Sequence, residues 1–140
     1  MTKKIVSTLA GLILLFAVAA PLQASSSLNS EMTVVVPFNF AAGDKILPAG
    51  EYTVRVDQDR SCVVLRQGRH NLVMLLTVHN YSSVPPQRGK LVFKRYGASF
   101  FFSEVWNQYN PTGQELIPSA REKEMFSKTQ PEQILLVQAR

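Results

Sequence analysis

The chain has 140 residues, of which 15 are Lys or Arg and 10 are Asp or Glu, so its formal net charge is +5. Apolar residues make up 46 % and charged residues 18 %, the balance of one folded globular domain and not of a disordered chain. The single cysteine excludes an intrachain disulfide framework and a cysteine-rich metal site. The basic residues are scattered, so we expect no nucleic-acid partner, which would need a clustered basic face.

Residues 1–24 have the pattern of a secretory signal peptide. Lys3 and Lys4 give a basic start, an apolar run from Ile5 to Ala20 follows, and Ala24 offers the small side chain that a signal peptidase needs. The apolar run is shorter than the roughly 20 residues that span a bilayer as a helix. We therefore expect cleavage after Ala24, with an uncleaved anchor as the alternative.

Cleavage at this point predicts a periplasmic or secreted protein. It would leave a polar leader over 25–31 and a single β-domain over 32–140, with a net charge of +3. We expect no membrane span after cleavage, because no later segment is long and apolar enough to form one. Cys62 lies far from the cleavage region, which excludes a lipid-modified N-terminus.

The segment 33–40 alternates as a β-strand does. Val34, Val36, Phe38 and Phe40 fall on one face at a period of two. Pro37 faces the other way and lacks an N–H group, so it predicts an edge strand or a strand that bends there.

Six further stretches have the composition and turn-bounded spacing of strands. They are residues 51–56, 62–67, 71–79, 90–96, 99–106 and 134–137. The stretch 71–79 is apolar on both faces, so we expect it to be central, with another element packed on its outer face.

The residues Gly97-Ala98 predict a two-residue hairpin turn between 90–96 and 99–106. Pairing Tyr96 with Ser99 places three pairs opposite one another: Arg95 with Phe100, Phe93 with Phe102, and Leu91 with Glu104. This register predicts an aromatic cluster of Phe93, Phe100 and Phe102. It also turns Arg95 and Glu104 toward the apolar face.

A short helix is predicted from Ser119 to about Lys128. Ser119 and Glu122 have the spacing of a capping box, and Glu124 can pair with Lys128 one turn later. Pro131 ends the helix, which either plugs an open end of the sheet or covers residues 71–79. The predicted fold is therefore all-β, a small antiparallel barrel or sandwich of about seven strands with one short helix near the C-terminus.

Four residues are candidates for ligand binding: Arg95, Glu104, Trp106 and Tyr109. Charges that face an apolar interior must be paired or reach water, so Arg95 and Glu104 either cap the two ends of the barrel or hold a polar ligand inside it. Trp106 and Tyr109 lie near strand ends, where aromatic rings either close the core or stack against sugars.

Several blocks together resemble a family of small exported proteins abundant in soil-dwelling acidobacteria. The blocks are Val36-Pro37-Phe38-Asn39-Phe40, residues 47–54, residues 90–97, residues 101–106 and residues 115–124. The resemblance covers roughly 32–125 and implies an exported, compact protein, but no catalytic residues. The family's pre-helix block reads Leu-Pro-Lys-Ser, whereas this chain has Ile117-Pro118-Ser119 without the lysine.

The first functional hypothesis is a non-enzymatic exported β-domain that binds a protein or glycan partner, or contributes to the envelope or matrix. One alternative is a lipocalin-like carrier of a small apolar or amphipathic ligand, which needs an internal cavity of several hundred Å³. Another is a carbohydrate-binding module that uses Trp106 and Tyr109. Because the chain has none of the common hydrolase, metalloprotease or nucleotide-binding motifs, we expect no catalytic residue, no cofactor and no metal. An enzyme would need His70 or His79 beside a carboxylate and a hydroxyl.

Overall fold

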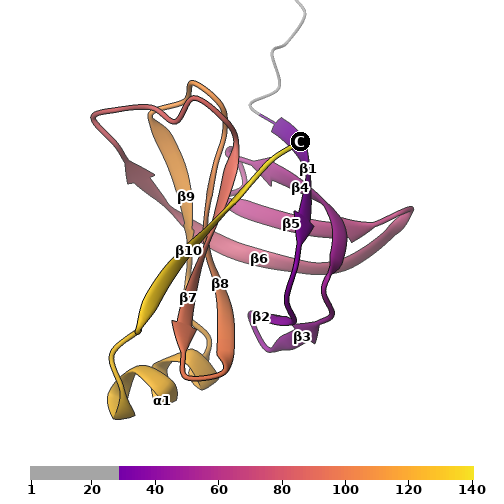
Figure 1. The fold of residues 1–140 in the computed structure, drawn as a ribbon. Coiled ribbons are helices and arrows are strands. Elements are labelled where there is room, and N and C mark those ends of the chain that lie inside the picture. The colour runs from indigo at the N-terminus through magenta and orange to yellow at the C-terminus, as the bar shows by residue number, and fades with distance from the viewer. Residues whose placement is uncertain (1–28) are drawn as a thin grey trace, which may run out of the picture.

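The computed structural model describes residues 29–140 (Figure 1). The predicted signal peptide lies outside the described residues. The elements in chain order are β1 (Asn29–Val36), β2 (Phe40–Ala42), β3 (Lys45–Leu47), β4 (Gly50–Asp57), β5 (Cys62–Gln67), β6 (His70–Tyr81), β7 (Lys90–Tyr96), β8 (Ser99–Trp106), β9 (Thr112–Leu116), α1 (Ala120–Lys128) and β10 (Gln133–Gln138).

The strands form one mixed sheet in the order β1-β4-β5-β6-β9-β8-β2-β3, with β7 pairing β8 and β10. Because β7 pairs along the whole of β8, the other edge of β8 is divided between β9 and β2. The sheet does not close within the described residues. Its two ends still touch, since Val34 and Ala139 form one bridge and the Arg140 N–H donates to the Thr33 carbonyl at 3.0 Å.

The prediction of a mostly β chain with one short helix near the C-terminus is confirmed. The described residues hold ten strands where about seven were expected. Pro37 divides the predicted strand 33–40 into β1 and β2, while β3 and β9 form where no strand was expected. β1 also begins at Asn29, inside the segment predicted as a leader, because Asn29 pairs with Asp57 of β4.

The core lies on the inner face of the curled sheet and is centred on aromatic rings. The Phe93 ring lies 5.1 Å from Phe38, 5.2 Å from Phe40 and 5.5 Å from Phe102, and Phe38 stacks on Phe100 at 4.2 Å. The predicted cluster of Phe93, Phe100 and Phe102 is therefore confirmed. Phe38 and Phe40, which flank the bend after Pro37, complete it.

The outer face of β6 is not covered in the described part of the chain, contrary to the prediction. Met74, Leu76 and Val78 are 68 %, 64 % and 50 % exposed. The helix α1 packs elsewhere, because its Met125 lies against the small cluster of Ala41, Tyr96 and Phe101. Figure 1 shows α1 beside the turn between β7 and β8, at the end of the sheet away from the β8–β9 loop.

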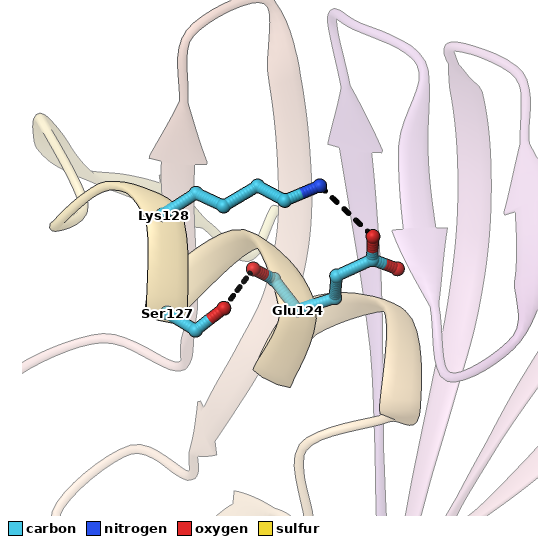
Figure 2. A network of polar contacts seen from close by, with 3 residues as sticks. All are labelled: Glu124, Ser127 and Lys128. Carbon is cyan, nitrogen blue, oxygen red and sulfur yellow. Dashed lines mark hydrogen bonds and ion pairs between the residues drawn. The ribbon is translucent and has the colours of Figure 1, made fainter.

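The start and the outer surface of α1 agree with the sequence. Ser119 is the N-cap, and its Oγ accepts a hydrogen bond from the Glu122 N–H at 3.2 Å. On the outer surface the Lys128 Nζ lies 2.9 Å from the Glu124 Oε1, and the Ser127 hydroxyl donates to the Glu124 carbonyl (Figure 2). Within residues 29–140 no helix has the length and apolar character that crossing a bilayer takes.

Candidate functional site

The four predicted site residues lie at two separate ends of the β7–β8 hairpin. Arg95 shares the inner face with Phe93, as predicted, but it lies beside the hairpin turn. Its guanidinium is 3.5 Å from a carboxylate oxygen of Glu132, whose N–H donates to the Arg95 carbonyl. Arg95 is therefore engaged by the segment before β10 and is not brought together with Trp106 or Tyr109.

Glu104 lies on the outer face of β8, which corrects the prediction that it faces the interior. The pairs nearest the turn form as predicted, but a bulge follows Phe93–Phe102, and Ser103 has no partner on β7. Glu104 therefore pairs with Val92, and Leu91 pairs with Val105. One extra residue moves every later side chain of a strand to the opposite face.

Trp106 is built into the outer face of the sheet. Its ring is 7 % exposed and its Nε1 donates to the Glu104 carboxylate at 2.7 Å. The ring lies over Gly113 of β9, where a Cβ atom would come within 2.6 Å of it. The Lys90 Nζ lies 5.9 Å from the ring centroid. The Trp106 ring is thus buried between Gly113 and the Lys90 side chain, and neither of its faces is free for a sugar to stack on.

Tyr109, by contrast, presents its ring to solvent. It is 70 % exposed and has a φ of 57°, in the left-handed region that residues other than glycine rarely adopt. This conformation is held because the Tyr109 N–H donates to the Pro86 carbonyl at 2.8 Å. The neighbouring Gln108 amide donates to the Gln87 carbonyl at 2.9 Å. These two hydrogen bonds join the β6–β7 loop to the β8–β9 loop. The position of Tyr109 is therefore pre-organised before any ligand binds.

A hollow of about 580 Å³ opens between these two loops and β10, and we call it the loop hollow. Its walls are Pro86, Gln87, Arg88, Lys90, Gln108, Tyr109 and Gln138. A second hollow of about 730 Å³ shares Arg88 and Gln108 and extends toward the start of β1 and the last residues of the chain. The two hollows therefore adjoin along Arg88 and Gln108.

The loop hollow carries positive charge and amide groups. Arg88 and Lys90 form no ion pair within residues 29–140, and Lys90 is placed by its contact with Trp106. The three glutamines supply both hydrogen-bond donors and acceptors. Such a surface can hold a polar ligand that carries hydroxyl groups and negative charge.

Tyr109 and Trp106 were predicted from the sequence as site residues, whereas Arg88 and the glutamines were not. The run Pro85-Pro86-Gln87-Arg88 indicates a break between strands, and nothing in the sequence around Arg88 indicates that it binds a ligand. The signal that could have found the site is the combination of this polar loop with the aromatic loop at 106–109. Their proximity depends on the pairing of β6 with β9.

The described residues contain no group of three or more His, Cys, Asp or Glu side chains that could hold a metal ion. His70 and His79 are both exposed on β6. Comparison of the chain with known protein families, with curated proteins and with solved structures finds no match.

Proposed function

We propose that this chain is an exported, non-catalytic binding domain that holds an acidic glycan in the loop hollow. The observation that carries the proposal is the Tyr109 ring, which is exposed yet held in a left-handed conformation by the Pro86 carbonyl. Backbone strain of this kind persists where the surroundings impose it and often accompanies function. Here it presents a flat aromatic face beside two cations that form no ion pair with the part of the chain that the structure describes.

The chemistry of the loop hollow suits an acidic sugar. An aromatic face packs against the apolar C–H side of a pyranose ring. The amides of Gln87, Gln108 and Gln138 can bind hydroxyl groups, and Arg88 and Lys90 can bind the carboxylate of a uronic acid. A neutral sugar would leave the two cations unused, so a polyuronate is the better match.

The predicted signal peptide and the resemblance to exported acidobacterial proteins both support a location outside the cytoplasm, where such polymers occur. The scaffold in this proposal is a barrel-like curled sheet whose seam lies between β1 and β10. The carrier alternative, which places a ligand inside the sheet, has less support. The inner face is occupied by the ring of Phe93 and by the rings of Phe38, Phe40 and Phe102, each of which contacts it.

Affinity gel electrophoresis in polygalacturonate, alginate and neutral dextran tests the proposal. We expect both uronate polymers to retard the protein and dextran to leave its migration unchanged. Tyr109→Ala and Arg88→Gln should each abolish most of the retardation. Tyr81→Ala is the matched control for the ring, because Tyr81 is 74 % exposed but does not line the loop hollow.

Because the chain is basic, simple attraction to any polyanion must be separated from glycan binding. Arg69→Gln changes the net charge as Arg88→Gln does, but Arg69 lies in the β5–β6 turn. It should leave the retardation intact. Polyacrylate carries carboxylates without sugar rings, so equal retardation by polyacrylate and polygalacturonate would overturn the proposal. So would equal losses in the Arg69 and Arg88 variants.

A further inference from the structure

A separate hollow lies under the helix, at the opposite end of the hairpin from Tyr109. It has a volume of about 270 Å³ and lies between α1 and β7, and we call it the helix hollow. Its walls are Lys94, Tyr96, Pro118, Glu122, Lys123 and Phe126. At about 30 Å³ for each water-sized group, it has room for a ligand of about nine such groups.

The hollow follows from the way α1 is seated. Met125 packs against the small cluster that includes Tyr96, whereas Phe126 stays 51 % exposed although it shares the helix face of Glu122 one turn earlier. A large aromatic ring is thus held beside an open space. A ligand with an apolar part would gain contact with Phe126 and Pro118 and would remove their surface from water.

The base of the hollow holds a carboxyl group with no ion-pair partner. Glu122 is 7 % exposed, and none of the ion pairs within residues 29–140 includes it. Burial raises the pKa of the Glu122 carboxyl, and Lys94 and a hydrogen bond with Tyr96 partly offset that rise, while Glu115 adds to it. A buried carboxyl takes up a proton more easily than an exposed one, and in the protonated form it can donate a hydrogen bond.

The charges around the hollow select the ligand. The groups that act on Glu122 are Lys94 and Tyr96 on β7 and Glu115 on β9, and Lys123 on its own helix also lines the hollow. Lys94 and Lys123 together outnumber the one carboxyl in the wall, so the lining is positive overall. A ligand amine would meet two ammonium groups, whereas a ligand carboxylate would lie between them.

We propose that the helix hollow binds a small amphipathic carboxylate, with its carboxylate between Lys94 and Lys123 and its apolar part against Phe126 and Pro118. In the bound state the Glu122 carboxyl is protonated and donates a hydrogen bond to the ligand carboxylate. The ligand site is therefore outside the curled sheet, and it is independent of the glycan proposal because the two hollows share no residue.

Three ligands of nearly equal shape test the charge preference: phenylacetate, phenylacetamide and phenethylamine. Each is titrated into the ¹⁵N-labelled protein, purified after expression of the full chain, and followed by two-dimensional NMR. We expect saturable shifts at Lys94, Tyr96 and Glu122 with phenylacetate, and binding of the other two weaker by about threefold to fivefold, as for a partly exposed ion pair. Lys123→Ala should weaken the binding of phenylacetate to a similar degree. Lys128→Ala is the control and should leave the binding unchanged, because Lys128 pairs with Glu124 on the outer surface of α1 (Figure 2).

The pH dependence separates a binding role of Glu122 from a structural one. Affinity for phenylacetate should rise as the pH falls from neutral, because the Glu122 charge that repels the ligand is lost. Glu122→Gln should bind at neutral pH as the native chain does at lower pH, with no remaining pH dependence in the range where phenylacetate itself stays ionised. Tighter binding of phenethylamine, shifts confined to the loop hollow, or an unchanged pH profile in Glu122→Gln would each overturn the proposal. If Glu122→Gln does not fold, the Lys123 and Lys128 variants still decide it.

Discussion

The indole nitrogen of Trp106 donates a 2.7 Å hydrogen bond to Glu104, which lies two residues earlier on the same face of β8. The bulge at Ser103 places both residues on the outer face, since without it Glu104 and Trp106 would both face the core. The same ring lies over Gly113 and beneath Lys90. The pair therefore anchors one wall of the loop hollow.

Replacing Glu104 should destabilise the fold. In Glu104→Ala the buried Trp106 Nε1 loses its acceptor, and an unsatisfied buried donor costs about 1–3 kcal/mol. Urea denaturation followed by tryptophan fluorescence measures the free energy of unfolding. Glu104→Gln keeps an oxygen acceptor and should retain most of the stability, so equal losses in the two variants would show that the charge matters and not the hydrogen bond.

Gly113→Ala should also destabilise the chain. The new methyl group would lie 2.6 Å from the Trp106 ring, which would have to leave its place between Glu104 and β9. Overpacking of this kind costs about 1–3 kcal/mol, and the indole emission should shift to longer wavelength as the ring becomes exposed. Gly50→Ala is the control, because its methyl group would meet its nearest neighbour at 3.5 Å. A stable Gly113→Ala protein with unchanged emission would contradict this account.

The ion pair between Arg95 and Glu132 should contribute little to stability. Its side chains are 40 % and 51 % exposed, and its nitrogen and oxygen are 3.5 Å apart. A double-mutant cycle with Arg95→Gln and Glu132→Gln should give a coupling energy below about 1 kcal/mol that decreases further in high salt. A larger coupling, insensitive to salt, would mean that Arg95 acts in a buried environment.

Two glutamates on one helix should change stability with pH in opposite directions. Burial raises the pKa of Glu122, so its protonation favours the folded state, and this contribution is lost as the pH rises through the raised pKa. The hydrogen bond and ion pair between Glu124 and Lys128 lower the pKa of Glu124. The stability that Glu124 contributes is therefore present above its ordinary pKa and is lost as the pH falls through the lowered pKa.

Thermal unfolding across the acidic range measures both effects. At neutral pH, Glu122→Gln should unfold at a higher temperature than the native chain, and the difference should shrink as the pH falls. Glu124→Gln should unfold at a slightly lower temperature at neutral pH and should match the native chain at low pH. The same sign of change in both variants would show that Glu122 is not held in a buried environment.

Local patterns in the sequence predicted the β7–β8 hairpin and the start of α1. The pairing of Tyr96 with Ser99 follows from a two-residue turn, and the Ser119 cap follows from a four-residue motif. The register beyond Phe93 could not be predicted, because nothing in the residues around Ser103 distinguishes a bulge from continued alternation. The bulge at Ser103 is therefore the reason that the predicted position of Glu104 was wrong.

The strand β9 was missed for a related reason. Gln114 occupies a core-facing position and is 1 % exposed, with its carbonyl oxygen accepting from the Thr77 hydroxyl at 2.7 Å. A polar residue at this position interrupts the alternation of apolar and polar residues from which a strand is predicted. Only part of the loop hollow could likewise be predicted from the sequence. Tyr109 and Pro86 come together through pairing between strands that are distant in the sequence.

The bridge between Val34 and Ala139 joins residues separated by most of the chain. On a nascent chain, β1 can pair with β4 early, but its second edge has no neighbour until residues 139 and 140 have been synthesised. Contacts of such long range are slow to form, and an open strand edge is prone to pair with other chains in the meantime. Residues 139 and 140 thus cover part of the second edge of β1, so their removal should first increase aggregation during synthesis.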